Sequence, residues 1–306
     1  MKLGKIAEIC YNITTSYLNL PGNTDIIIST QKAILTTKHQ LLDDAFARWS
    51  PLNGDISFSY NGGKDCQVLL LIYLSCLWEF FLNTIKGSQY GGNSHQFPLF
   101  ELPTVFIDQE ETFSTIKAFV EDTSDRYGLS LYESSRNDTV KMSMAMAFEH
   151  YLSLHQETKA IVIGIRHSDP FGENLKYIQE TDSGWPEFMR IQPILHWNLS
   201  NIWSFLLYSG EPICGLYGVG YTSLGGLNNT LPNPYLKLSD NTEEKKSEFE
   251  WELNHRFENQ KLELEIHPND RAILDTFSNK YKPGWYLTDE KLERAGRLKK
   301  TSVKKD

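Results

Sequence analysis

The segment "ISFSYNGGKDCQVLLLIYL", residues 56–74, carries the strongest structural signal in this chain. It passes from a short run of β-type residues through Asn61-Gly62-Gly63-Lys64-Asp65 into a long apolar stretch. This order predicts a buried strand, a tight turn and a core helix that starts near Cys66. Glycines let such a turn bring successive N–H groups close to an anion, at the positive end of the helix dipole. The segment predicts a phosphate-binding loop, although an unliganded strand–helix turn contains the same glycine pair.

Two common phosphate-binding loops do not fit this segment. A Walker A loop needs a spaced second glycine before Lys-Ser/Thr, and here Asp65 stands where the magnesium-binding hydroxyl would be. The dinucleotide fingerprint GxGxxG is absent, because Gly62-Gly63 is followed by Lys64, Asp65 and Cys66.

The chain around this segment alternates apolar strands with helical patterns. Nearly all-apolar strands that are separated by helices are typical of a parallel sheet with both faces covered. We therefore predict an α/β fold, a Rossmann-like parallel sheet with helices on both faces. The predicted strands are 55–60, 102–108, 128–134 and 160–165, and the predicted helices between them are 66–86, 112–126 and 141–155.

Segments of different character flank this core and predict three domains. Residues 1–50 show helical periodicity and predict an N-terminal helical segment that caps the core. Residues 51–237 form the predicted α/β core, which after residue 165 changes to loops and one helix at 199–209. Residues 238–306 are predicted to be a C-terminal extension that returns to the active site. Its charged part, 238–265, predicts a solvated helix or a partly mobile insertion.

Composition and charge narrow the functional classes. A net charge of −9 over 306 residues has the wrong sign for a protein that holds nucleic acid through its overall field. The four cysteines form no CxxC pair, so neither a zinc site nor a disulfide framework is indicated. The N-terminus resembles no signal or transit peptide, and the apolar run 68–82 is interpreted as too short to span a bilayer. We expect a cytoplasmic, monomeric protein without a nucleic acid or membrane partner.

The loop motif S-x-N-G-G-K-D-C resembles the pyrophosphatase-type loop (PP-loop) of enzymes that cleave ATP between its α and β phosphates. Asn61 and Cys66 depart from the usual SGGxDS pattern, and these departures are similar to the eukaryotic FAD synthetases, which are FMN adenylyltransferases on a fold like that of phosphoadenylylsulfate (PAPS) reductases. The similarity to the fungal enzymes extends over about residues 1–237 and 281–297. It includes "SFSYNGGKDC", "LPTVFIDQEETF", "GIRHSDPFGE", "TDSGWPEFMRIQPILHW", "IWSFLL", "PICGLYGVGYTSLGG" and "PGWYL…LERAGR".

The resemblance implies an ATP site around the loop. Residue chemistry supports part of it, since Gly164 after an apolar strand permits close approach of a nucleotide, while Arg166 suits a phosphate and Asp169 suits magnesium. A salt-bridged loop without a ligand is the structural alternative. The implied ATP-binding residues are Ser59, Asn61, Gly62, Gly63, Lys64, Asp65, Ile107, Gly164 and Arg166, with Asp65 and Asp169 as Mg²⁺ ligands.

The resemblance also implies an FMN site. Within "TDSGWPEFMR", Asp182 can accept from the isoalloxazine N–H, Trp185 can pack on the ring and Arg190 can reach a carbonyl or the phosphate side. A tryptophan that only packs is the alternative. In the predicted final helix "DEKLERAGRLKK", Arg294 and Arg297 share a face, where they either meet the phosphates or complement surface carboxylates. The implied FMN- and FAD-binding residues are Asp169, Asp182, Trp185, Arg190, Arg294 and Arg297.

The reaction that the resemblance implies is FMN + ATP → FAD + pyrophosphate, with Mg²⁺ as cofactor. The implied catalytic residues are Asn61, Asp65, Asp169 and Arg297. Three alternatives stay open. A PAPS reductase-like enzyme needs a reactive cysteine, yet residues 215–306 contain none after Cys214. A flavin- or nucleotide-binding protein would bind without turnover. A tRNA-modifying PP-loop enzyme would need a basic face.

Overall fold

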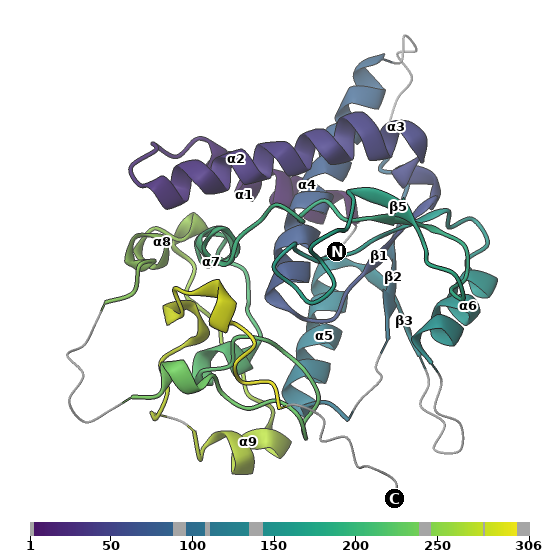
Figure 1. The fold of residues 1–306 in the computed structure, drawn as a ribbon. Helices are drawn as coiled ribbons and strands as arrows, with labels where there is room; N and C mark the ends of the chain where they lie inside the picture. Colours follow the sequence, from purple (N-terminus) through teal and green to yellow (C-terminus); the bar gives the residue numbers. More distant parts are fainter. Residues whose placement is uncertain are drawn as a thin grey trace, which may run out of the picture.

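The computed structural model describes residues 3–87, 96–107, 111–134, 143–238, 246–277 and 279–298. Its centre is a six-stranded sheet with the order β3-β2-β1-β4-β6-β5 (Figure 1). The strands are β1 (Ile56–Ser59), β2 (Leu102–Phe106), β3 (Leu129–Glu133), β4 (Ala160–Val162), β5 (Ile178–Glu180) and β6 (Met189–Ile191). Neighbours are parallel except for the edge strand β5, which is antiparallel to β6.

The predicted parallel α/β sheet is thus confirmed, and two strands must be added to it. β5 and β6 lie in the region that the sequence predicted to consist of loops and one helix. Both strands contain three residues, and so short a segment shows no periodicity that distinguishes a strand from a loop. Residues 108, 141, 142 and 239–245, which belong to predicted elements, lie outside the described residues.

Helices cover both faces of the sheet, as predicted. The connections are α4 (Lys64–Gly87), α5 (Ser114–Tyr127) and α6 (Met144–Leu154). On one face, α6 contributes Phe148 and Tyr151 to a cluster with Val105 of β2 and Ile161 of β4. The main core, which includes β1, α4 and α5, lies on the other face. The strand order therefore reverses between β1 and β4, and the crevice outside such a reversal is where open α/β sheets bind ligands.

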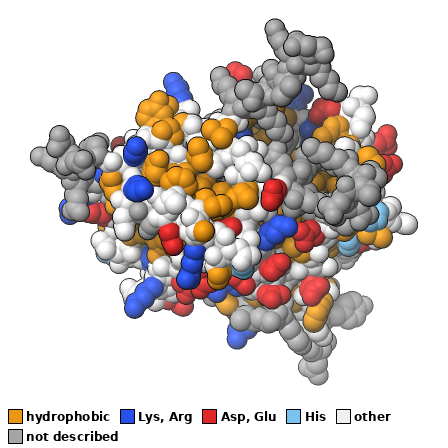
Figure 2. Space-filling model, turned by 90° about the horizontal axis from the view of Figure 1, so that it is seen from below, with side chains coloured by type: hydrophobic (Ala, Val, Ile, Leu, Met, Phe, Trp, Pro, Cys, Tyr) orange, Lys and Arg blue, Asp and Glu red, His pale blue; other side chains and the backbone are white. Residues whose placement is uncertain are grey.

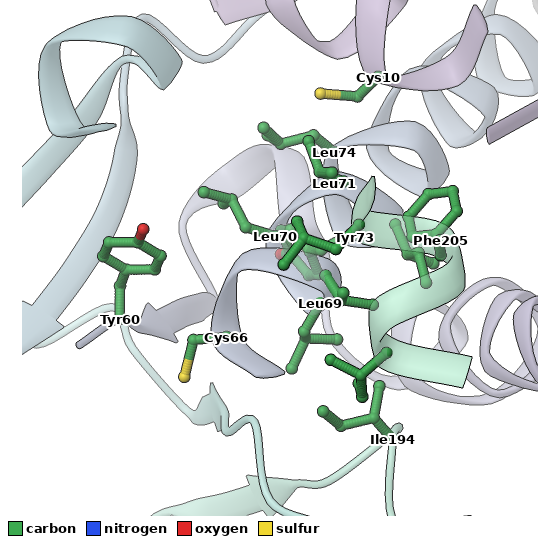
Figure 3. Close-up of a cluster of buried hydrophobic side chains, with 14 of the residues drawn as sticks. Cys10, Tyr60, Cys66, Leu69, Leu70, Leu71, Tyr73, Leu74, Ile194 and Phe205 are labelled. Carbon is green, nitrogen blue, oxygen red and sulfur yellow. The ribbon is translucent and has the colours of Figure 1, made fainter. Parts of the chain in front are cut away.

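Helix α4 is the centre of the main core. The residues from 68 to 74 are all fully buried, and Figure 3 shows leucines of α4 between Cys10 of α1 and Phe205 of α7. By length and composition, the segment Lys64–Lys86 is long and apolar enough to cross a membrane. The interpretation of residues 68–82 as too short was therefore wrong as a statement about length, because the helix extends beyond the purely apolar run. In this fold its apolar surface is covered by neighbouring helices.

The N-terminal residues form the predicted helical cap (Figure 1). Its elements are α1 (Leu3–Leu18), α2 (Asp25–His39), a π-helical segment (Gln40–Ala45) and α3 (Phe46–Arg48), followed by a 3₁₀ turn (Pro51–Asn53). Leu3, Ile6, Cys10 and Ile13 of α1 are buried in the same core as α4. The boundaries at residues 50 and 237 stay predictions, since the cap and the sheet share one core.

The remaining helices are α7 (Leu199–Tyr208), α8 (Glu250–Asn254) and α9 (Pro268–Leu274), with 3₁₀ turns at Gly215–Val219, Pro234–Leu236, Phe257–Asn259, Gly284–Tyr286 and Glu290–Leu292. For the described part of the charged segment, the prediction of a solvated helix was wrong. The short helix α8 packs on α7, where Phe249 and Glu252 are each 2% exposed. Trp251 stacks on Tyr208 with 6.3 Å between ring centroids. Aromatic residues spaced among the charges cause this burial.

The predicted final helix was also wrong. Beyond the 3₁₀ turn at Glu290–Leu292, the chain continues in single turns, with Ala295 N–H donating to Leu292 O and Arg297 N–H to Arg294 O, and it also pairs with residues 229–231. Leu231 N–H donates to Gly296 O and Leu298 N–H donates to Asn229 O, each at 2.9 Å. A Cβ at Gly296 would lie 2.2 Å from Leu231 O, so only glycine permits this approach. Arg294 and Arg297 consequently do not share a helical face.

Candidate active site

The loop between β1 and α4 makes the tight turn that the sequence predicted. Gly62 has a φ of 74°, in the left-handed region that glycine adopts without strain. Gly63 N–H donates to Asn61 Oδ1 and Lys64 N–H donates to the hydroxyl of Tyr217, both at 2.9 Å. The two amides expected to face an anion are therefore engaged by protein oxygens in this state.

The loop that follows β4 lies beside this turn, on the other side of the strand reversal. It carries Arg166, whose side chain is fully buried. Arg166 Nε lies 2.7 Å from Asp65 Oδ1, and Arg166 Nη2 lies 2.5 Å from Glu293 Oε2. The side chain of Lys64, 2% exposed, is 2.9 Å from Asp65 Oδ2 and also pairs with Glu293 Oε1. Two cations and two carboxylates thus form one buried cluster.

Glu293 is the member of this cluster that sequence reasoning missed. It lies in "LERAGR", where the prediction assigned roles to the arginines and none to the glutamate. The sequence did contain a clue, because Glu293 is an acidic residue within a motif that was expected to return to the active site. Without coordinates, a surface glutamate and one bridging two buried cations look alike.

Charge balance holds the cluster in its ionised form. Burial lowers the pKa of Arg166 and of Lys64, but Asp65 and Glu293 outweigh burial, and both pKa values are raised above their usual values. Burial raises the pKa of Asp65, but Lys64 and Arg166 outweigh it, and the net shift is downward. Burial, and next the charge of Asp65, raise the pKa of Asp169. Of the two aspartates, Asp169 is therefore the one that is more easily protonated.

Asp169 closes the loop after β4. Its Oδ2 accepts from Arg166 N–H at 2.9 Å, and its own N–H donates to Arg166 O at 3.0 Å. Its Oδ1 is 3.9 Å from Arg166 Nη2, a distance that leaves this oxygen loosely held. Three of the residues predicted for phosphate and metal, Asp65, Arg166 and Asp169, are thus brought together.

The other predicted ATP-site residues lie at or just after the carboxyl ends of β1, β2 and β4. Ser59 ends β1 and is half-buried, and Ile107 follows β2, where it packs on the apolar cluster of α6. Gly164 was predicted to permit close approach of a nucleotide. In the structure, a Cβ at Gly164 would lie 2.9 Å from Cys66 Sγ and 3.1 Å from Cys66 Cα. The absence of a side chain at Gly164 thus lets the backbone after β4 approach the first turn of α4.

Three of the predicted flavin residues, Asp182, Trp185 and Arg190, form a second group. Arg190 Nη1 lies 3.1 Å from Asp182 Oδ2, and Arg190 Nη2 donates to Glu180 O at 2.8 Å. Trp185 is 38% exposed and its ring lies 6.0 Å from that of Phe148. A cavity of about 520 Å³ is lined by Asp182, Trp185 and neighbouring residues of the same hairpin, together with Lys159, which precedes β4.

The two groups lie at different ends of the sheet. Met189, at the start of β6, pairs with Ala160, at the start of β4. The hairpin 181–188 thus lies at the amino end of these parallel strands, whereas the loop with Arg166 lies at their carboxyl end. Three strand residues separate the ends by roughly 10 Å. Only an extended ligand can contact both groups in this arrangement.

The C-terminal arginines are outside both groups. Arg294 is exposed. Arg297 donates from Nε to Ser223 Oγ at 3.0 Å and from Nη1 to Thr230 Oγ1 at 3.1 Å. The residues of this segment that reach the buried cluster are acidic, with Glu293 in direct contact and Glu290 at 3.7 Å from Arg166 Nη1.

Comparison with known proteins first identifies the class of domain to which the α/β core belongs. Residues 55–232 match the phosphoadenosine phosphosulfate reductase domain, in agreement with the doubly wound sheet and the loop at its strand reversal. The chain is 57% identical to the flavin adenine dinucleotide synthase of Saccharomyces cerevisiae, over 98% of this chain and 100% of that protein.

Solved structures agree with this match. One is the Candida glabrata FMN adenylyltransferase in complex with FAD and inorganic pyrophosphate, with a TM-score of 0.91 and 58% identity, over 97% of this chain and 100% of the other. Another is the same enzyme with FMN and the ATP analogue AMPCPP, with a TM-score of 0.88 and 55% identity, over 97% and 100%. The chain belongs to the FAD synthase (FMN adenylyltransferase) family.

Proposed function

We propose that this chain is an FMN adenylyltransferase, which transfers AMP from ATP to the phosphate of FMN and releases pyrophosphate. The observation that carries the proposal is the pair of buried cations, Lys64 and Arg166, at the strand reversal of a chain that belongs to the FAD synthase family. That crevice is where a doubly wound sheet takes a nucleotide.

The chemistry requires positioning more than proton transfer. An oxygen of the FMN phosphate attacks the α-phosphorus of ATP, and the bond from that phosphorus to the oxygen bridging to the β-phosphorus breaks. Because the attacking phosphate is already an anion, no general base is needed. Lys64 and Arg166 neutralise charge on the leaving pyrophosphate, which is the main catalytic contribution in phosphoryl-type transfer. Asn61 shapes the loop through its bond to Gly63 N–H.

The proposal also includes Mg²⁺ as the cofactor. Among the described residues no group of three or more His, Cys, Asp or Glu is arranged to hold a metal ion. A nucleotide-bound Mg²⁺ takes most of its ligands from phosphates and water and needs one or two carboxylates. Asp65 and the loosely held Oδ1 of Asp169 suit this role, and the bound ion would neutralise charge on the phosphates.

The flavin part of the site rests on the hairpin at the amino end of β6. Trp185 offers an aromatic face, while Asp182 and Arg190 offer polar groups for the ring edge. FAD is a long molecule, so its two ends suit the two separated groups of residues. Arg297 must leave its contacts with Ser223 and Thr230 to reach a phosphate.

Two rival functions lose support. All four cysteines are buried, and burial raises the pKa of the Cys214 thiol to about 12. Such a thiol stays protonated at neutral pH and is a poor nucleophile, which disfavours reductase chemistry.

The tRNA-modifying alternative would need a basic surface. On the face seen in Figure 2, Lys and Arg lie among Asp, Glu and apolar side chains, and the visible part has no continuous basic surface for RNA.

The test is product analysis. Purified protein is incubated with ATP, Mg²⁺ and, separately, FMN, riboflavin and adenylylsulfate, and the products are identified by mass. We expect FAD and pyrophosphate with FMN. Saturable binding of FMN and ATP without FAD would identify a binding protein instead, and thiol-dependent reduction of adenylylsulfate would identify a reductase.

A further inference from the structure

The carboxylate of Glu293 occupies the position between the two buried cations of the site. Its side chain is 7% exposed, and its two oxygens contact different partners, with Oε1 at Lys64 Nζ and Oε2 at Arg166 Nη2. The main chain is held as well, because the Thr222 hydroxyl donates to Glu293 O at 2.6 Å. A residue from the C-terminal extension is thus seated inside the sheet's ligand crevice.

This carboxylate completes the charge balance of the cluster. Lys64 and Arg166 supply two positive charges, and Asp65 and Glu293 supply two negative ones. Glu290 adds a further carboxylate at 3.7 Å from Arg166 Nη1. A triphosphate that entered with Glu293 in place would meet a neutralised, carboxylate-rich cluster, and like charges at close range are strongly unfavourable.

Arg166 also retains donors for a larger anion. Its Nη1 is buried and has no hydrogen-bond partner among the described residues. Leaving a buried guanidinium nitrogen unbonded is costly. Carboxylate and phosphate oxygens bind the same guanidinium and ammonium donors, and phosphate offers more oxygens.

We propose that Glu293 is a resident anion in the phosphate subsite of Lys64 and Arg166, and that the phosphates of ATP or pyrophosphate bind by displacing it. This inference rests on the proposed function, because it assigns the subsite to the leaving pyrophosphate. Displacement frees the segment that also carries Arg294 and Arg297, so a ligand that removes Glu293 allows those arginines to approach it. The apparent affinity for phosphates is then reduced by the fraction of molecules in which Glu293 is seated.

The test is calorimetric binding of inorganic pyrophosphate to Glu293→Gln. Glutamine keeps the size of the side chain and removes the charge that competes with phosphate. We expect pyrophosphate to bind about tenfold more tightly. This is the gain expected if Glu293 is seated in roughly nine of ten wild-type molecules and the substitution abolishes that state. Glu248→Gln, which neutralises an exposed carboxylate of the same extension, is the matched control and should bind like wild type.

Thr222→Val provides a milder version of the same test. Valine keeps the shape of threonine but removes the hydroxyl that holds Glu293 O. The carboxylate stays in the chain and is seated less firmly, so we expect pyrophosphate to bind roughly two- to threefold more tightly. This variant keeps the test decisive if Glu293→Gln does not fold.

Unchanged or weaker pyrophosphate binding in the folded variants overturns the proposal, since a purely structural glutamate would give that result. FAD synthesis by the wild-type protein is measured in parallel. Normal synthesis with unchanged pyrophosphate affinity in the variants rejects only the displacement of Glu293. Absence of FAD synthesis in the wild type rejects the proposed function itself.

Discussion

The Nε of Arg166 lies 2.7 Å from Oδ1 of Asp65, so the loop after β4 and the first turn of α4 share one buried ion pair. The two residues, at positions 65 and 166, are far apart in the sequence and meet because β1 and β4 are neighbours in the sheet. Removing one partner of such a pair leaves an uncompensated buried charge, which is far more costly than losing an exposed pair.

Replacing Arg166 with methionine should impair both catalysis and stability. Loss of one charge-stabilising donor should lower the rate of FAD formation by on the order of 10²–10³. Asp65 and Glu293 would then be buried without their guanidinium, at a cost of about 3–5 kcal/mol in the free energy of unfolding. Steady-state kinetics and urea unfolding measure the two effects. Arg48→Met, which breaks an exposed pair with Asp44, is the control, and a turnover of Arg166→Met within threefold of wild type would refute the role.

Asp169→Asn should increase stability while it lowers activity. In the folded protein the pKa of Asp169 is raised, first by burial and then by Asp65, so the ionised form is disfavoured relative to the unfolded chain. The raised pKa means that protonated Asp169 favours the folded state. This contribution to the free energy of unfolding is present at acidic pH and is lost as pH rises through the folded-state pKa. Asparagine carries no such charge, so the variant should gain stability over wild type at neutral pH, and the gain should shrink toward acidic pH. Chemical unfolding across this range measures it.

Activity of the same variant tests the proposed metal role. If Asp169 helps to hold Mg²⁺, turnover should fall on the order of 10² and should recover in part at high Mg²⁺. An Asp169→Asn protein with wild-type turnover and an unchanged Mg²⁺ requirement would exclude Asp169 as a ligand.

Gly164→Ala should destabilise the junction of β4 and α4. The added Cβ would lie 2.9 Å from Cys66 Sγ, 3.1 Å from Cys66 Cα and 3.2 Å from Cys66 N, so backbone atoms must move. Overpacking of this kind costs about 1–3 kcal/mol, measurable by thermal or urea unfolding. The double variant Gly164→Ala/Cys66→Ala removes only the sulfur contact and should recover little. Full recovery would mean that the sulfur alone restricts this position.

Trp185→Ala should weaken FMN binding and leave ATP binding unchanged. The ring is part of the hairpin cavity at the amino end of β6 and is distant from the cluster around Arg166. Loss of an aromatic contact is worth roughly tenfold in the FMN dissociation constant, which quenching of flavin fluorescence measures. Phe100→Ala, at an exposed aromatic side chain, serves as the control. Equal weakening of ATP and FMN binding would place Trp185 outside a separate flavin subsite.

Much of the fold was readable from the residues in chain order. Apolar strands separated by helical periods predicted the sheet and its covered faces, because hydrophobic periodicity is a local property of a segment. The same holds for the tight turn at Gly62, because the positive φ that such a turn requires is a conformation that glycine adopts without strain. The three-residue strands β5 and β6 and the packed helix α8 escaped prediction, since segments so short acquire their structure from their neighbours.

The features of the candidate site likewise fall into those that the sequence predicted and those that only the tertiary structure revealed. The sequence predicted Lys64, Asp65, Arg166 and Asp169 as phosphate and metal residues, from their position after strands and from the family resemblance, and the structure brings these four side chains together. Tertiary structure was needed to bring in Glu293, to separate the flavin hairpin from the loop, and to replace the final helix with backbone pairing to residues 229–231. These features depend on which distant segments meet, and burial and charge compensation arise only where they do.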